Sequence, residues 1–164
     1  MSSGIEHDQA SISLAPVIGT AVFAGTGDII LGCAAAMGSY SGIYFSPDLD
    51  MIQITRSERL AINHYKIIGY LFYLYWLPYA YAIPHRHPLS HWPVIGTIGR
   101  VCYGLVGLFV LAAVVNLFLP GAFNAFIKAV GSYYFAAWMV GLMVADTGHW
   151  VMDSEIVKLI RRLI

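Results

Sequence analysis

Three of the six histidines in this chain fall within one stretch of seven residues, at His85, His87 and His91. Imidazole nitrogens and carboxylate oxygens are the ligands that zinc and other divalent metals take in proteins. Further histidines and aspartates stand near the ends of other segments: His7, Asp48, Asp50, His149 and Asp153. These residue types predict a metal site, provided that the fold brings the separate segments together.

Two spacings indicate how pairs of these ligands are presented. His149 and Asp153 are four residues apart, which places both on one face of a helix, and Asp146 falls on that face too. Asp48 and Asp50 are two residues apart, so both could point at one ion from an extended loop. The set exceeds the ligands that one zinc ion needs. The sequence is compatible with two bound ions, and equally with one ion that has further carboxylates around it.

The composition places these residues in a membrane protein. Of 164 residues, 59% are hydrophobic and 11% are charged, whereas a soluble domain has roughly 25% charged residues. A soluble protein of this size could not bury so much apolar surface, so we expect the bilayer to solvate much of it. The formal net charge is zero, which gives no indication of nucleic acid binding. We expect residues 1–164 to form a single membrane-embedded metal-binding domain.

The apolar pattern predicts an all-α integral membrane protein with about four transmembrane helices in two hairpins. The expected spans are Ser11–Phe23, Ile29–Phe45, Thr97–Leu119 and Ala122–Val144. Turn signals at Gly25-Thr26-Gly27-Asp28 and Pro120-Gly121 divide each pair, and Asp28 is expected to cap the second helix. We expect the last helix to continue through Asp153.

The segment Ile67–Pro84 is apolar but rich in Tyr and Trp, which favour the membrane–water interface. Pro78 is expected to break or kink a helix there. We therefore predict an interfacial or re-entrant segment, because a full crossing would put His85 and His91 across the membrane from Asp48.

Basic residues predict the orientation of the chain. Eight Lys and Arg residues lie on the side of the termini in this arrangement: Arg56, Arg59, Lys66, Arg86, Arg100, Lys158, Arg161 and Arg162. Only Lys128 lies on the other side, so the positive-inside rule predicts cytoplasmic termini and a cytoplasmic metal site. Cys33 and Cys102 fall inside apolar runs without a CxxC pair, and we expect buried structural thiols.

Five motifs occur in this order: His7-Asp8, Ser46-Pro47-Asp48-Leu49-Asp50, Pro84-His85-Arg86, Leu89-Ser90-His91-Trp92-Pro93 and Gly96-Thr97-Ile98-Gly99-Arg100. With them the chain resembles the DUF2227 family of metal-binding bacterial membrane proteins over about residues 4 to 153. It is more loosely similar to the predicted membrane-bound metal-dependent hydrolases, which resemble zinc phospholipase C in ligand types. The resemblance implies a bacterial inner or thylakoid-type membrane and seven metal ligands: His7, Asp48, Asp50, His85, His91, His149 and Asp153.

Two functions from different classes fit these residues. The first is a membrane-bound hydrolase of a phosphoester or lipid-derived substrate, with zinc as the expected metal and iron or manganese as alternatives. An unligated Asp50 or Asp153 would take a proton, and Arg86 would stabilise negative charge or anchor a phospholipid headgroup.

The second function is a non-catalytic accessory subunit, in which the metal holds loops together. Small residues at 32–36 would then pack against other membrane subunits or a second copy. His87-x-x-x-His91 also resembles one histidine box of the membrane desaturases, which use more histidines than this chain has. His87 is a weaker ligand candidate, and His64 is expected at the surface.

Overall fold

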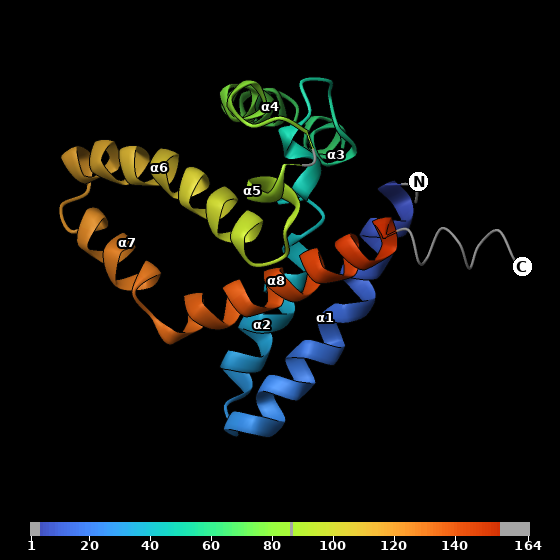
Figure 1. Cartoon of the computed structure of the whole chain (residues 1–164). Coiled ribbons are helices and arrows are strands. Elements are labelled where there is room, and N and C mark those ends of the chain that lie inside the picture. The colour runs from blue at the N-terminus through green and yellow to red at the C-terminus, as the bar shows by residue number, and fades with distance from the viewer. Residues whose placement is uncertain (1–3, 86, 155–164) are drawn as a thin grey trace, which may run out of the picture.

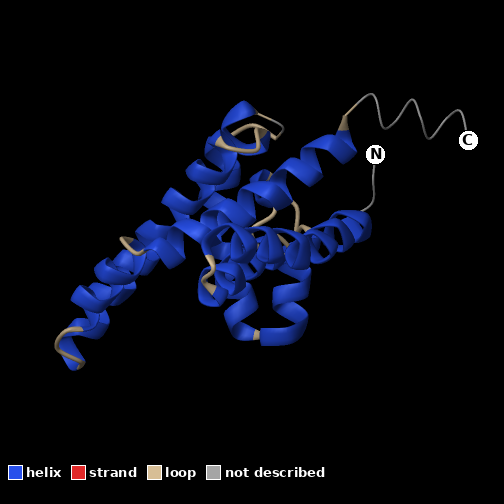
Figure 2. Cartoon of the chain, turned by 90° about the horizontal axis from the view of Figure 1, so that it is seen from below, coloured by secondary structure: helices blue, strands red, loops and turns tan. Residues whose placement is uncertain are grey.

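The computed structural model describes residues 4–85 and 87–154, and all regular structure in these ranges is helical (Figures 1 and 2). The expected all-α class is therefore confirmed for the described residues. The elements are α1 (Gly4–Thr26), α2 (Ile29–Ser41), the 3₁₀ helix η1 (Pro47–Asp50), α3 (Arg56–Tyr65), α4 (Ile67–Ala82), α5 (Pro88–His91), α6 (Ile95–Phe118), α7 (Ala122–Val130) and α8 (Tyr133–Asp153).

Helices α1, α2 and α8 pack against one another, and the α1–α2 hairpin extends below α8 in the view of Figure 1. Two glycines let α2 and α8 approach closely. A Cβ at Gly38 would collide with the Trp138 carbonyl, and a Cβ at Gly141 would collide with the Ala35 carbonyl. Small residues at a helix crossing are typical of membrane helix packing. Part of the small-residue run at 32–36 thus packs inside the chain, where Ala35 is fully buried.

The first hairpin has the predicted turn. Asp28 caps α2, and its Oδ1 accepts hydrogen bonds from the Ile30 and Leu31 backbone N–H groups. The neighbouring Gly27 has a φ of 70°, a conformation that glycine adopts without strain. Helix α1 begins at Gly4, earlier than expected, so His7 is a helical residue.

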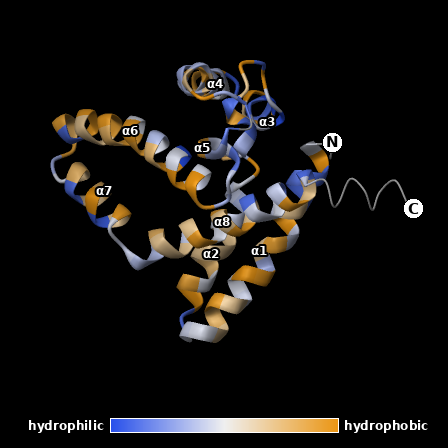
Figure 3. Ribbon diagram, viewed as in Figure 1, coloured by the Kyte–Doolittle hydropathy of each residue, from blue (hydrophilic) through white to orange (hydrophobic). Residues whose placement is uncertain are grey.

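Among the described residues, two helices, α1 and α6, are long and apolar enough to cross a membrane, and the bent pair α7 and α8 gives a third candidate. Four spans are not confirmed, because α2 has only 13 residues, about 20 Å of helix. The return helix also breaks by 54° at Gly131. There the Ser132 hydroxyl accepts from the Phe135 N–H and begins α8. Figure 3 shows apolar residues concentrated on α6, α7 and the lower parts of α1 and α2.

Helix α4 runs through Pro78, so of the expected break or kink at this residue the break is wrong. Contacts with α6 support the helix: the Tyr75 hydroxyl donates to the Tyr103 carbonyl at 2.5 Å, and the Tyr103 hydroxyl donates to the Tyr75 carbonyl at 2.7 Å. Its 16 residues extend about 24 Å, which is shorter than the hydrocarbon core. The aromatic segment is also partly core, since Trp76 and Leu49 pack together and fix η1.

Both cysteines are exposed, which corrects the expectation of buried thiols. Cys33 lies on α2 and Cys102 on α6. In a membrane protein an apolar run can face lipid as well as the core, so apolar neighbours do not predict burial within the chain.

Candidate metal centre

Helices α1 and α8 present His7 and His149 side by side. Their rings stack with centroids 3.6 Å apart and planes inclined by 10°. Both residues are buried. Asp153, one turn after His149, contacts both: its carboxylate oxygens lie 3.4 Å from His7 Nε2 and 3.5 Å from His149 Nε2. The shared helix face predicted for His149 and Asp153 is therefore present.

The two aspartates of η1 contact different nitrogens of His91 and lie in a 3₁₀ helix, which corrects the expectation of an extended loop. Pro47 begins a 3₁₀ helix, and the Ser46 hydroxyl caps it by accepting from the Asp48 N–H. With three residues per turn, side chains two positions apart diverge. Asp48 Oδ1 lies 3.7 Å from His91 Nε2 and 3.8 Å from His149 Nε2.

Asp50 turns instead to the other side of His91. Its oxygens lie 2.7 Å from His85 Nδ1 and 3.2 Å from His91 Nδ1, and its side chain is fully buried. A carboxylate at Nδ1 fixes the orientation of a histidine and leaves Nε2 for a metal, an arrangement common around protein metal sites. The geometry suits Asp50 to orient His91, whose Nε2 faces Asp48.

The seven residues form three overlapping groups with metal-ligand spacing: His7, His149 and Asp153; Asp48, His91 and His149; Asp50, His85 and His91. The first two groups share His149, and the last two share His91. Because His149 Nε2 is the atom close to both Asp153 and Asp48, and one nitrogen binds one ion, these two groups supply a single ion more readily than two.

The donor set fits a divalent cation. The Nε2 atoms of His91 and His149 are buried, and neither has a hydrogen-bond partner among the described residues. Buried polar atoms are normally hydrogen-bonded. Nitrogens left in this state beside a carboxylate, here Asp48, are typical of a site that completes its interactions with a metal.

Charge coupling within the site is strong. Burial lowers the pKa of His91, but Asp48 and Asp50 outweigh burial and raise this pKa to about 9. Burial raises the pKa of the two carboxyl groups, while His91 and the other nearby histidines hold the pKa of each below its usual value. Without a cation His91 therefore carries a proton at neutral pH, and a bound metal would replace that positive charge.

A buried ion pair ties the two ligand-bearing segments to α6. Arg100 is fully buried, and its guanidinium donates to the Asp146 carboxylate and to the Ser90 carbonyl. Asp146 stands three residues before His149, and Ser90 immediately precedes His91. The Thr97 hydroxyl also donates to Asp146. One arginine thus links α8 and α5, which carry His149 and His91.

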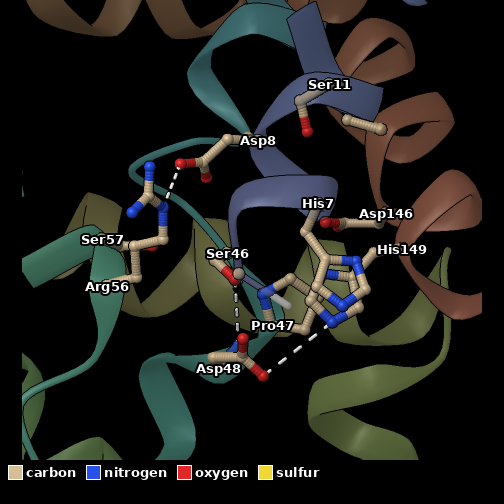
Figure 4. Close-up of a pocket in the computed structure, with 13 residues that line it drawn as sticks. His7, Asp8, Ser11, Ser46, Pro47, Asp48, Arg56, Ser57, Asp146 and His149 are labelled. Carbon is tan, nitrogen blue, oxygen red and sulfur yellow. Dashed lines mark hydrogen bonds and ion pairs between the residues drawn. The ribbon is translucent and has the colours of Figure 1, made fainter. Parts of the chain in front are cut away.

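A cavity of about 10 Å³ adjoins the ligands (Figure 4). This volume matches one water molecule. The lining residues include His7, His149, Asp48, Asp146, Asp8, Arg56 and three serines, Ser11, Ser46 and Ser57. From the sequence, Arg56 and Arg100 are expected only to contribute to the positive-inside orientation, with Arg100 also part of a family motif, and neither is expected at the metal site. A charged residue inside an apolar run could have indicated that Arg100 is buried and paired. Arg56 lies in a polar segment and has no comparable signal.

The remaining candidates separate clearly. His87 caps α5, where its Nδ1 accepts from the Leu89 N–H, and it belongs to none of the three ligand groups. His64 is exposed, as predicted. Arg86, the predicted stabiliser of negative charge, lies outside the described residues.

The family comparison agrees with this geometry. A family model described as "Uncharacterized metal-binding protein (DUF2227)" matches residues 2–162. The chain belongs to the DUF2227 family. None of the curated proteins and none of the solved structures compared with this DUF2227 protein matches it. The family description agrees with the metal binding predicted from its histidines and aspartates, and it contains no reference to hydrolysis.

Proposed function

We propose that this DUF2227 protein is a membrane-bound metal-dependent hydrolase that acts on phosphoester or lipid-derived substrates at the cytoplasmic face. One observation carries the proposal: the buried imidazoles of His7 and His149 and the half-buried carboxylate of Asp48 line a cavity with room for one water. A structural zinc site is closed by four protein ligands, whereas a catalytic site keeps a position for water. Zinc suits the nitrogen and oxygen donors best, with iron and manganese as alternatives.

In this proposal His91, His149 and Asp48 hold the ion and leave one position for water, while His7 stacks on His149 beside them. A divalent metal supplies a bound water of lowered pKa and a positive charge that polarises the substrate. Asp50 and His85 act around this centre, because Asp50 is engaged by two imidazole Nδ1 atoms. Asp153 is the better proton acceptor, since its side chain is 23% exposed while that of Asp50 is fully buried. Arg86 is proposed, from the sequence alone, to stabilise negative charge on the substrate.

An accessory subunit is the second candidate, and the exposure of α6 favours it. Leu117 is 78% exposed and Phe118 is 83% exposed. These side chains need lipid, another membrane subunit or a second copy of the chain as their surroundings. In this role the metal would only hold the segments together.

Metal analysis of the purified protein in detergent tests the common basis of both roles. His91→Ala should weaken zinc binding at least about tenfold, because even the hydrogen-bond partners of ligands have effects of that size. His64→Ala is the matched control, since His64 is an exposed histidine that belongs to none of the three ligand groups. Equal zinc affinity in both variants would overturn the site.

Hydrolysis separates the two candidates. Wild type, Asp153→Asn and Asp50→Asn would be assayed against phosphomonoesters, phosphodiesters and lipid phosphates. We expect Asp153→Asn to keep zinc and lose turnover, and Asp50→Asn to lose zinc affinity. Zinc-loaded wild type that hydrolyses none of these compounds would favour the accessory subunit.

A further inference from the structure

Arg56 brings a guanidinium to the cavity of the metal centre. It is the first residue of α3 and lines the cavity together with His7, Asp48 and His149 (Figure 4). The start of α3 is well defined, because the Thr55 hydroxyl and the Glu58 side chain form a capping box there. The Arg56 side chain is 42% exposed, so the charge lies at the mouth of the cavity.

The first two turns of α1 hold Arg56 in place. Arg56 Nε donates to Asp8 Oδ2 at 2.5 Å. A Cβ at Gly4 would lie 2.8 Å from Arg56 Cδ, so the glycine leaves room for the arginine stem. Asp8 is also the neighbour of His7 in the chain. One helix therefore orients both a metal-ligand candidate and a guanidinium toward the same cavity.

The geometry leaves donor groups of Arg56 available. No described residue other than Asp8 accepts a hydrogen bond from this side chain, and a guanidinium carries five N–H donors in a rigid fork. The fork matches the oxygens of a phosphate group in a bidentate arrangement. His149, which is 5% exposed, also lines this cavity. Its buried Nε2 has no hydrogen-bond partner among the described residues, so this part of the wall is where we place the metal.

We propose that Arg56 is the anion-recognition residue of this site and binds a phosphate group at the mouth of the cavity, beside the metal. Asp8 and Gly4 fix its orientation. This inference rests on the proposed function and narrows its substrates to those with a phosphate group. The enclosed volume of about 10 Å³ holds a water and no phosphate, so the phosphate stays at the mouth and faces the water-sized space.

Calorimetric titration of inorganic phosphate into the zinc-loaded protein in detergent tests the proposal. Arg56→Gln should weaken phosphate binding about tenfold or more, since a charge-assisted hydrogen bond is lost, with the zinc content unchanged. Arg59→Gln is the matched control, because Arg59 is an exposed arginine of the same helix outside the cavity lining. Arg56→Lys, which keeps the charge and the stem, should bind phosphate with intermediate affinity and serves if Arg56→Gln does not fold.

Two results would overturn the proposal: no phosphate binding by zinc-loaded wild type, or equal phosphate affinity in the Arg56→Gln and Arg59→Gln variants. A failure of the metal site itself shows separately, as absent zinc in wild type. In that case titration of the zinc-free protein still compares the two arginine variants. Repeating the titration in phosphatidylcholine nanodiscs with and without phosphatidic acid separates the phosphate sources. Competition by phosphatidic acid in wild type alone indicates a lipid headgroup, and no competition indicates a free phosphate compound.

Discussion

The buried pair of Arg100 and Asp146 allows a quantitative prediction about the metal centre. In Arg100→Met the side chain keeps a similar length but loses its charge and its donors. Asp146, 2% exposed, then keeps the hydrogen bond from the Thr97 hydroxyl to its carboxylate. Breaking a buried ion pair from one side costs about 3–5 kcal/mol. We therefore expect unfolding of Arg100→Met in detergent to show a loss of about that size.

A double-mutant cycle separates packing from charge. Asp146→Leu combined with Arg100→Met leaves no unpaired buried charge, so the double variant should be more stable than Arg100→Met alone. Zinc affinity should stay reduced by about 10–100-fold in both, because Arg100 no longer connects Ser90, beside His91, to the α8 turn that precedes His149. The exposed Arg59 gives the control Arg59→Met, with a change within about 0.5 kcal/mol.

The refuting results are specific. If Arg100→Met unfolds like wild type, the ion pair does not stabilise the fold. If the double variant recovers full zinc affinity along with stability, Arg100 does not position the ligands, and its role is confined to the stability of the helices.

Two further predictions concern pH and topology. His91 has a pKa of about 9 against an ordinary 6.5, so without metal its ion pairs stabilise the fold fully below pH 6.5, and this stabilisation is lost as the pH rises through about 9. Zinc competes with that proton, so zinc affinity measured against a chelator should rise by up to about tenfold per pH unit toward pH 9. A zinc affinity that does not change with pH would contradict the pairing of His91 with Asp48 and Asp50. In a variant with Cys33→Ser, Cys102→Ser and Asn124→Cys, an impermeant maleimide should label residue 124 from outside the cell, and labelling only from the cytoplasmic side would contradict the predicted orientation.

The candidate ligands could be picked out from the sequence because their chemistry is visible there, and the structure brings them together in three groups with metal-ligand spacing. Histidines and aspartates at the ends of apolar segments are unusual in a membrane protein, and the four-residue spacing of His149 and Asp153 needs only a helix to bring them together. Family membership agrees with that prediction. The helical class followed equally from the long apolar runs.

Other features depend on tertiary structure and had no sequence signal. The divergence of Asp48 and Asp50 follows from the 3₁₀ turn begun by Pro47, and a two-residue spacing alone fits an extended loop as well. The bend at Gly131 and the continuous α4 through Pro78 depend on local caps and on contacts with α6. The exposure of Cys33 likewise depends on which face of α2 meets its neighbours.

The stacked rings of His7 and His149 have a consequence for how the protein is made. One ring comes from the first described helix and the other from the last, so the two rings meet only after every intervening helix has been synthesised. Chains emerge from the ribosome with the N-terminal end first. During biosynthesis a nascent chain therefore exposes His7 without its partner, and tight metal loading becomes possible only when α8 has been inserted. Metal acquisition would then mark the completion of membrane insertion, and a chain stalled before α8 would remain unloaded.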